Sequence, residues 1–243
     1  MTKGQQLEKM QRDWDARARE NARYYVATGK TDWSDEEFFA SGEKAIADDI
    51  LTDMTNICQG KDPQQMRVLE IGCGAGRITR ALANLFGEVH AVDVSGEMIA
   101  RARQALTDKP NAHVYQNNGY DLAVVPWLTP KAAWLPRWLA RMAPAKWKRD
   151  FDFAYSNIVF QHIPSREVIE NYVREVHRLL RPGALFKFQV QGFPRDVNPD
   201  DTWNGVSFSD EQACAMAERN HFEPRYRHGA ETQYFWLWYF KKP

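Results

Sequence analysis

Residues 67–76 read RVLEIGCGAG, and this stretch decides the fold. Its first half, RVLEI, is a short apolar run of the kind found in buried strands. Gly72, Gly74 and Gly76 follow at once, and a helical pattern of apolar residues begins after them. Glycine has no Cβ, so such a loop lets the backbone come close to a ligand. In an open parallel sheet the ligand crevice lies at the carboxyl ends of the strands, so this loop is expected to line a binding site.

Strand-like and helix-like segments alternate after the glycine loop. Further strands are expected at residues 88–94, 112–116, 151–156 and 184–190. The segments between them include amphipathic helical patterns, and Pro182-Gly183 is expected to turn the chain into the last of these strands. Strands that are separated by helices pair in parallel, because a parallel connection needs a crossover. This alternation of strands and helices therefore predicts an α/β sheet with helices on both faces.

Both ends of the chain add elements to this sheet. Residues 1–62 show helical periodicity, and we expect them to form an N-terminal helical lid or substrate segment. Two apolar segments near the C-terminus, around 222–227 and 233–240, are joined by a short link and predict an antiparallel hairpin. The main domain is accordingly expected to span residues 63–243.

Composition excludes several classes of protein. The chain has 243 residues, 44% hydrophobic and 26% charged, as expected of a globular rather than a disordered protein. Its 32 basic and 32 acidic residues balance, which argues against a general polyanion binder. No apolar run could span a bilayer, and the polar N-terminus lacks the apolar core of a secretion signal. Cys58, Cys73 and Cys214 are widely spaced, which predicts neither disulfides nor a metal site and favours the reducing cytoplasm.

Two nucleotide ligands compete for the glycine loop. A dinucleotide site has the spacing G-x-G-x-x-G, with the pyrophosphate resting on a helix N-terminus. Here the third glycine would fall at Arg77 or Thr79, and Glu70 would place a carboxylate beside the phosphates. S-adenosylmethionine carries no phosphate, and its ammonium group can be received by that carboxylate. Asp93, which ends the second strand, can accept hydrogen bonds from both ribose hydroxyls, so the pattern favours S-adenosylmethionine over NAD.

Four segments resemble successive motifs of the class I S-adenosylmethionine-dependent methyltransferases. They read VLEIGCGAGRIT, HAVDVSGEMI, FDFAYSNIVFQHI and LLRPGALFKFQV, and the resemblance spans about residues 65–190. It implies a Rossmann-like, seven-stranded, mostly parallel sheet of order 3-2-1-4-5-7-6, with helices on both faces and the last strand antiparallel. It also implies transfer of a methyl group from S-adenosylmethionine to an acceptor.

The resemblance also implies the cofactor contacts. The glycine loop would hold the methionine end, and the end of the second strand would bind the ribose and adenine. In the loop after the third strand Tyr120 stands where the family usually has an acid, so Asn118 and Gly119 are expected to border the adenine. Asn157 matches a position near the reacting methyl group. The expected cofactor-binding residues are Glu70, Gly72, Cys73, Gly74, Gly76, Asp93, Val94, Met98, Asn118, Gly119 and Asn157.

Methyl transfer requires alignment of the acceptor and exclusion of water. A hydroxyl acceptor also needs a base, and His162, after the fourth strand, is our candidate, although a structural role at a helix start explains it equally well. In the family, the N-terminal helices and the loops after strands four and five usually contact the acceptor. The residues expected to contact the acceptor are therefore Tyr24, Tyr25, Trp33, Gln161, Gln191 and Trp203. The many rings favour a small organic acceptor, with O- and N-methylation both open.

Residues 123–150 depart from the family pattern. This segment holds four of the nine tryptophans, and its six basic residues precede its first acid, Asp150. We expect a crossover helix packed on the sheet; a membrane-surface contact through 126–149 is the second interpretation. A nucleic-acid surface is least favoured, because residues 157–160 lack the prolines that follow the fourth strand in methyltransferases of nucleobase amines.

Several functions therefore compete. The leading hypothesis is a methyltransferase of a small molecule, and a membrane-associated methyltransferase of a lipid or quinone precursor is a variant of it. An NAD-dependent oxidoreductase and an aminopropyl transferase are rivals with the same fold. A cofactor-binding adaptor docked on a membrane is the non-enzymatic alternative. The sequence predicts no oligomeric state.

Overall fold

A single seven-stranded sheet forms the centre of the protein. The computed structural model describes residues 2–126, 150–195, 198 and 200–243. The strands follow the order β3-β2-β1-β4-β5-β7-β6, and only β7 runs antiparallel to its neighbours. This confirms the expected fold class. The strands are β1 (Arg67–Ile71), β2 (Glu88–Asp93), β3 (Ala112–Gln116), β4 (Phe151–Ser156), β5 (Leu180–Val190), β6 (Phe222–His228) and β7 (Phe235–Lys241).

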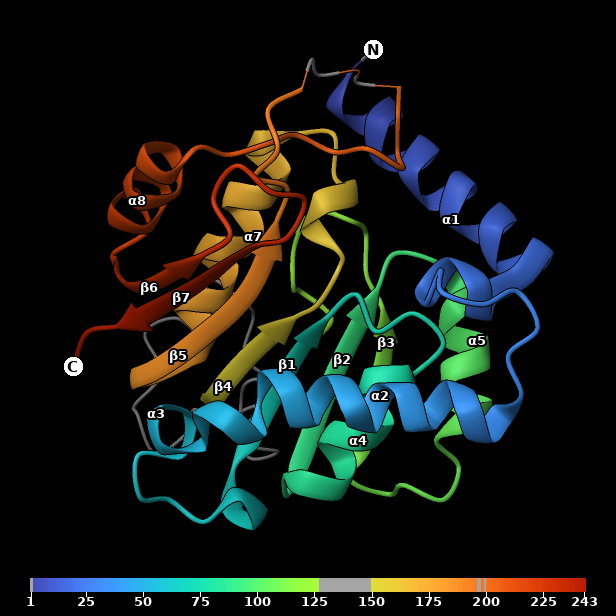
Figure 1. Cartoon of the computed structure of the whole chain (residues 1–243), viewed down its shortest axis with the longest axis horizontal. Coiled ribbons are helices and arrows are strands. Elements are labelled where there is room, and N and C mark those ends of the chain that lie inside the picture. Colours follow the sequence, from blue (N-terminus) through green and yellow to red (C-terminus); the bar gives the residue numbers. More distant parts are fainter. Residues whose placement is uncertain (1, 127–149, 196–197, 199) are drawn as a thin grey trace.

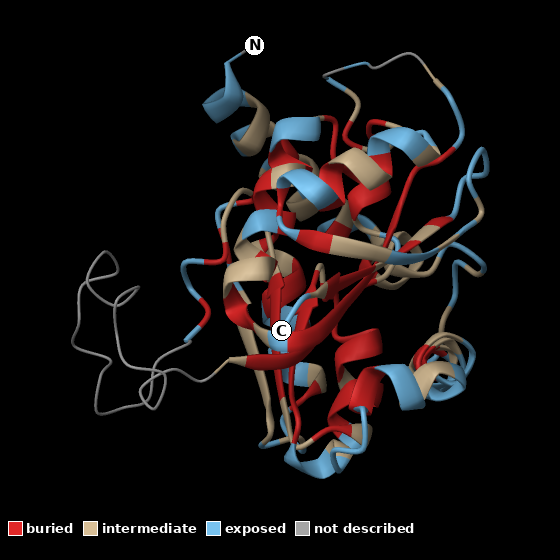
Figure 2. Ribbon diagram, turned by 90° about the vertical axis from the view of Figure 1, so that its left-hand side faces the viewer, coloured by how far each residue is buried: buried red, intermediate tan, exposed pale blue. Residues whose placement is uncertain are grey.

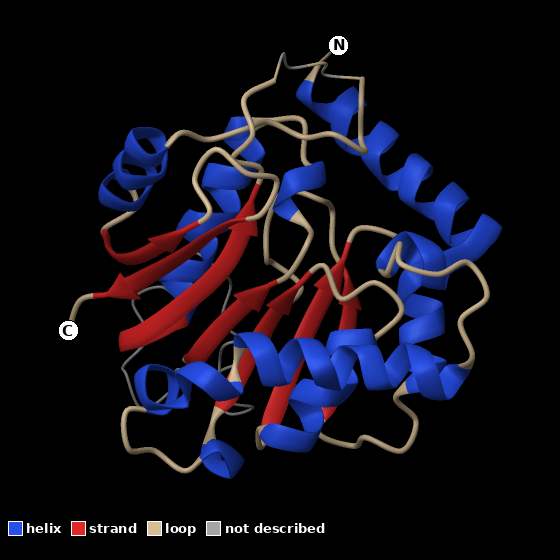
Figure 3. Cartoon of the chain, viewed as in Figure 1, coloured by secondary structure: helices blue, strands red, loops and turns tan. Residues whose placement is uncertain are grey.

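Helices cover both faces of this sheet (Figures 1 and 3). Side chains of α2, α3 and α4 share one apolar cluster with β1, β2 and β4, whereas α7 and α8 pack on the opposite face. The long helix α1 lies beyond the carboxyl ends of the parallel strands (Figure 1). The helices are α1 (Lys3–Val26), α2 (Asp35–Asp49), α3 (Met54–Cys58), α4 (Arg77–Leu85), α5 (Gly96–Ala105), α7 (Arg166–Leu179) and α8 (Asp210–Arg219).

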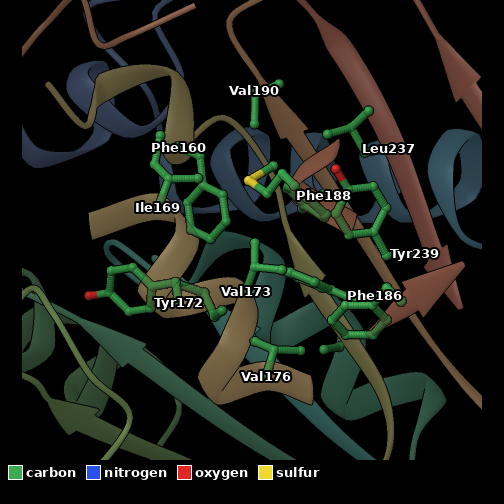
Figure 4. Packing of buried hydrophobic residues seen from close by; sticks show 14 of the residues in the cluster. Phe160, Ile169, Tyr172, Val173, Val176, Phe186, Phe188, Val190, Leu237 and Tyr239 are labelled. Atoms are coloured by element: carbon green, nitrogen blue, oxygen red, sulfur yellow. The ribbon is translucent and has the colours of Figure 1, made fainter. Parts of the chain in front are cut away.

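The alternation of side chains along the strands builds the two cores. In β1, Leu69 and Ile71 join the cluster on the α7 face, whereas Val68 joins the cluster on the α4 face. Phe186 and Phe188 of β5 lie against α7 on the same face, and both are fully buried (Figure 4). Burial of such a side chain contributes about 1.5–3 kcal/mol relative to exposure. Buried residues are accordingly concentrated in the sheet and on the inner faces of the helices (Figure 2). This packing holds the ends of the strands in fixed positions.

Serine side chains start four of the helices. Ser34, Ser95, Ser165 and Ser209 each accept a hydrogen bond from a backbone N–H in the first helical turn. These caps satisfy donors that a helix leaves unpaired at its N-terminus. The ends of the helices are therefore encoded locally in the sequence.

Two local expectations differ from the structure. The helical periodicity expected within residues 1–62 is interrupted near its end, because α2 ends at Asp49 and a 3₁₀ turn, Leu51–Asp53, precedes α3. Lys187 of β5 donates a hydrogen bond to the carbonyl oxygen of Asp49, and this satisfies an acceptor that a continued helix would use. Pro182-Gly183 lies inside β5 instead of before it. The pairing of β4 with β5 shifts register there, as expected of a bulge.

The parallel strands direct their carboxyl ends to one edge of the sheet, where the glycine loop follows β1, Asp93 ends β2 and Asn157 follows β4. None of the described helices combines the length and apolar character that crossing a membrane requires. Most of the aromatic and basic segment expected at 123–150, namely residues 127–149, lies outside the part of the chain that the structure describes.

Candidate active site

The glycine loop has a conformation that only glycine adopts without strain. Gly72, Gly74 and Gly76 have φ angles of 76°, 51° and 85°. A Cβ on Gly72 would lie 2.2 Å from Cγ2 of Val159, and one on Gly74 would lie 2.6 Å from Cγ2 of Val26. The loop is therefore enclosed between α1 and the turn that follows β4, and there is no room for a larger residue at Gly72 or Gly74.

Asp93 anchors this loop to the end of β2. Its Oδ2 accepts a hydrogen bond from Gly74 N at 2.8 Å, and its Oδ1 accepts one from Ser95 N at 2.9 Å. Burial raises the pKa of Asp93 to about 6, although the two backbone donors oppose this effect. Each carboxylate oxygen keeps further acceptor capacity, so the group is suited to ribose hydroxyls.

Glu70 and Asn157 supply polar groups at the methionine end. Thr79 Oγ1 donates to Oε2 of Glu70 at 2.6 Å, and burial raises the pKa of Glu70 to about 7. The Oδ1 atom of Asn157 is buried and accepts no hydrogen bond from the described residues. Both residues border the same cavity, and an unpartnered amide oxygen and a carboxylate there suit an ammonium donor. The residues present therefore fit the methionine group of S-adenosylmethionine.

A first cavity of about 90 Å³ lies beside the glycine loop. Met10, Trp14 and Val26 of α1 border it, and so does Asn117, which directly follows β3. Asn117 Nδ2 donates to the Tyr172 hydroxyl at 2.7 Å, which fixes that side chain. Of the expected cofactor-binding residues, the cavity is lined by Glu70, Gly72, Cys73, Gly74, Asp93, Val94, Met98 and Asn157.

Three expected cofactor-binding residues do not line this cavity. Gly76 caps α4 and faces Ala102, and Gly119 lies beneath Met10. The Asn118 oxygen instead accepts hydrogen bonds from Tyr120 N and the next amide, which closes the loop on itself. Asn117, the first residue after β3, borders the cavity instead, and contact of Asn118 and Gly119 with the adenine stays a prediction.

A second cavity of about 280 Å³ adjoins the first. The two share Tyr25, Val26, Arg77, Ile158 and His162. The second cavity contains most of the acceptor residues expected from the sequence: Tyr25, Trp33, Gln161, Gln191 and Trp203.

The residues around the second cavity differ in part from those expected from the sequence. Tyr24 does not line it, but packs edge-to-face on Tyr25 with ring centroids 5.2 Å apart. Arg77 was noted only as an obstacle to dinucleotide binding, although it borders both cavities. Gln233 and Tyr234, before β7, also lie here. Only the packing of the C-terminal hairpin brings them to the site, so no local pattern marks them.

His162 lies where the two cavities meet. Its Nδ1 contacts the carbonyl oxygen of Trp203, so Nδ1 carries the proton and donates it to this bond. Its Nε2 accepts from the Gln161 amide at 3.2 Å. Burial lowers the pKa of His162 to about 4, and the ring is therefore neutral at pH 7. A role for His162 as a catalytic base stays a prediction, and its hydrogen bonds give it a positioning role in the described structure.

Ile158 follows Asn157 in a strained conformation. Its φ of 54° lies in the left-handed region, which a β-branched residue rarely adopts. Such strain persists where the surrounding structure imposes it, and it clusters at functional sites. This turn places Ile158 at the junction of the cavities and packs Val159 over Gly72.

A separate polar cluster lies at the opposite ends of the strands. Glu88, His90 and His113 bring three ligand-type atoms within 4.8 Å of one another. Arg67 already occupies this cluster, with Nη2 3.0 Å from His90 Nε2 and Nε 3.4 Å from Glu88. A cation in this position competes with a metal ion, so we treat the cluster as a buried polar network.

Comparison with known proteins agrees with this geometry. Residues 69–186 match a family model described as a methyltransferase domain. The chain is 31% identical over 122 residues to a malonyl-[acyl-carrier protein] O-methyltransferase of Enterobacter lignolyticus, which covers 50% of this chain and 38% of that protein. It is 32% identical over 94 residues to a trans-aconitate 2-methyltransferase of Mycobacterium tuberculosis, covering 33% of this chain and 34% of the relative. The matches thus span well under half the length of these relatives.

Solved structures share the fold. The magnesium protoporphyrin IX methyltransferase of Synechocystis with bound S-adenosylmethionine superposes with a TM-score of 0.62 at 13% identity, over 98% of this chain and 97% of that one. The family match, the strand order and the glycine loop agree with one another. Residues 69–186 thus match a methyltransferase domain, and the strand order and glycine loop are consistent with the class I S-adenosylmethionine-dependent methyltransferases.

Proposed function

We propose that this protein transfers a methyl group from S-adenosylmethionine to a small organic acceptor that binds in the second cavity. One observation carries the proposal: the cofactor cavity and the second cavity adjoin, and they share Tyr25, Arg77, Ile158 and His162. An acceptor there would lie beside the methyl end of the cofactor. The enzyme's contribution is then alignment and exclusion of water.

The residues around the first cavity would bind the two ends of the cofactor. Bound S-adenosylmethionine supplies a methyl group activated by a positively charged sulfur. Asp93 would accept hydrogen bonds from the ribose, and Asn157 Oδ1 with Glu70 would receive the ammonium group. Trp14 and Val26 of α1 cover the cavity and would keep water away from the reacting atoms.

The acceptor atom is more consistent with oxygen than with nitrogen. One of the relatives is named as an O-methyltransferase, and the other is named for trans-aconitate, an acid. Among the described residues around the second cavity, no Asp or Glu is available to hold a protonated amine. These observations support O-methylation.

An NAD-dependent oxidoreductase fits the site less well. Arg77 and Thr79 occupy the positions at which a dinucleotide loop has its third glycine, and both side chains are buried. Thr79 also holds the Glu70 carboxylate in the loop. A buried carboxylate beside a pyrophosphate would be repulsive.

Calorimetry with S-adenosylhomocysteine and NAD tests the proposed cofactor. The wild-type protein is expected to bind S-adenosylhomocysteine and not NAD. Asp93→Ala is expected to weaken S-adenosylhomocysteine binding by about 1–3 kcal/mol, as is usual for lost hydrogen bonds to a charged group. Asp48→Ala, which changes an exposed carboxylate paired with Lys44, serves as the control and should bind normally. Binding of NAD alone would refute the proposal.

A further inference from the structure

We propose that the acceptor is a carboxylic acid, that Arg77 binds its carboxylate in the second cavity, and that an oxygen of this carboxylate takes the methyl group. This inference rests on the proposed function and adds the chemical class of the acceptor.

The second cavity is neutral except for one cation. Among the described residues that line it, Arg77 is the only one charged at neutral pH, since His162 is held neutral. The other polar side chains are amides and hydroxyls: Thr28, Ser41, Gln161, Gln191, Asn204 and Gln233, with the phenols of Tyr25 and Tyr234. A cavity of this composition attracts an anion and repels a cation.

The Arg77 guanidinium has donors to spare. The side chain is almost fully buried, and its Nη1 donates to Ser41 O at 3.1 Å and approaches Ser41 Oγ at 3.4 Å. Its Nε is buried and has no partner among the described residues. Burial opposes the charge of the guanidinium and lowers the pKa of Arg77, although the carboxyl groups of Glu70 and Asp49 lie near enough to favour the charged form. A carboxylate hydrogen-bonded directly to the guanidinium would therefore offset a remaining desolvation penalty.

The position of Arg77 is fixed by its surroundings. It is the first residue of α4, directly after the glycine loop, and α2 packs on its backbone. A Cβ on Gly42 of α2 would lie only 2.3 Å from the Arg77 carbonyl oxygen. Because Arg77 borders both cavities, a carboxylate that it holds would lie at their junction, where the methyl group is delivered.

Gln191 offers a second donor in the same cavity. Its Oε1 accepts a hydrogen bond from Phe193 N at 3.0 Å, which turns its Nε2 away from that contact. Nε2 makes no hydrogen bond with the described residues. An acceptor molecule can therefore find a charged donor at Arg77 and a neutral donor at Gln191, which suits an oxygen-rich acid.

A carboxylate also matches the weak basicity of the site. A hydroxyl acceptor would have to give up a proton, and the His162 ring already donates through Nδ1 and accepts through Nε2. A carboxylate is ionised at neutral pH and needs no base. Its oxygen bonds to the methyl carbon while the carbon–sulfur bond breaks, with that electron pair left on sulfur. The products are a methyl ester and a neutral thioether, and no proton is released.

The product distinguishes the acceptor classes. The full chain is incubated with S-adenosylmethionine labelled in the methyl group and a total extract of small molecules, and the labelled products are treated with mild alkali. Label released as methanol identifies methyl esters and is the expected result. Alkali-stable label, or no label while S-adenosylhomocysteine still binds, overturns this inference and leaves the cofactor assignment intact. Failure of the wild-type chain to bind S-adenosylhomocysteine overturns the proposed function itself.

Arg77→Gln tests the carboxylate site directly. With the purified labelled acid as acceptor, kcat/KM is expected to fall about 10- to 150-fold, the range for a lost hydrogen bond to a charge. Affinity for S-adenosylhomocysteine should stay within about twofold, since the cofactor's proposed hydrogen bonds go to Asp93, Asn157 and Glu70. Arg80→Gln is the matched control, one turn along the same helix and paired with Asp108. If Arg77→Gln weakens S-adenosylhomocysteine but not methylthioadenosine, which lacks the amino-acid group, Arg77 serves the cofactor carboxylate and the inference is wrong.

Gln191→Glu provides a second variant that does not disturb the buried guanidinium. Glutamate can still accept the hydrogen bond from Phe193 N, but it adds a negative charge to the cavity. Methylation of the acid should fall about tenfold or more, while S-adenosylhomocysteine binding is retained. Unchanged turnover of the acid in both Arg77→Gln and Gln191→Glu would overturn the proposed site.

Discussion

Asn157 and Asp49 lie 108 residues apart in the chain and are joined by a hydrogen bond, in which Nδ2 of Asn157 donates to Oδ2 of Asp49 at 3.0 Å. The Tyr155 hydroxyl donates to the same oxygen at 2.8 Å and accepts from Nδ2 of Asn157 at 2.9 Å. The amide nitrogen is thereby held by the end of α2, while Asn157 borders the first cavity and its buried Oδ1 accepts no hydrogen bond from the described residues. A residue of the N-terminal segment thus orients a group of the cofactor site.

Asp49→Asn is expected to weaken S-adenosylhomocysteine binding about fivefold, because the Asn157 amide loses its fixed orientation and its oxygen no longer faces the ammonium group. Methylthioadenosine lacks that group, so its affinity should not change. Calorimetry with both ligands makes the comparison. The neighbouring exposed residue provides the control variant, Asp48→Asn. Equal losses for the two ligands would show that Asp49 has only a structural role.

Helix α1 is expected to move when the cofactor enters. Val26 lies over Gly74 and Met10 lies over Gly119, and the first cavity measures only about 90 Å³ with α1 in place. Asp15 ties α1 to α5, since its Oδ1 accepts from Ser95 Oγ at 2.6 Å and from a backbone N–H of α5 at 3.2 Å.

Asp15→Ala should therefore speed both association and dissociation of S-adenosylhomocysteine, by about tenfold for a lost charged hydrogen bond. Stopped-flow tryptophan fluorescence measures the two rates. Glu8→Ala changes an exposed carboxylate on the same helix, whose contact is with Arg12, and should leave the rates unchanged. Rates of Asp15→Ala equal to those of the wild type would show that α1 does not control access.

Acid should destabilise the protein through His90. Burial, with Arg67 nearby, lowers the pKa of His90 to about 4, whereas an unfolded histidine titrates near 6.5. Between pH 6.5 and 4 the unfolded state binds a proton that the folded state does not, so stability falls as pH falls. One such group changes the free energy of unfolding by about 1.4 kcal/mol per pH unit in this window.

His90→Gln should accordingly flatten the loss of stability between pH 6.5 and 4, as measured by urea unfolding. The difference between variant and wild type isolates this group, because the raised pKa of Glu70 acts with the opposite sign between about pH 4.5 and 7. His228→Gln, at an exposed histidine, should leave the profile as in the wild type. A parallel pH profile for His90→Gln and the wild type would contradict the prediction.

The sequence alone determined the sheet and the cofactor loop. Strand periodicity, the serine caps and the glycine spacing are local, since each depends on residues that are neighbours in the chain. They placed β1, β3 and β4 at their observed bounds, and they selected Glu70, near the end of β1, and Asp93, the last residue of β2, both of which border the first cavity. Local patterns failed at Pro182-Gly183, where pairing with β4 turned an expected turn into a bulge.

Only the tertiary structure decided what lies between the two cavities. Arg77 reads locally as the first residue of a helix, and its unpartnered Nε results from burial under α2, whose Asp49 lies near it without forming an ion pair. In the same way, the orientation of the Asn157 amide depends on its hydrogen bond to Asp49. The orientation of the Gln191 amide depends on the hydrogen bond that it accepts from Phe193 N. Hydrogen bonding and desolvation depend on distance in space, and residues far apart in the chain set that distance.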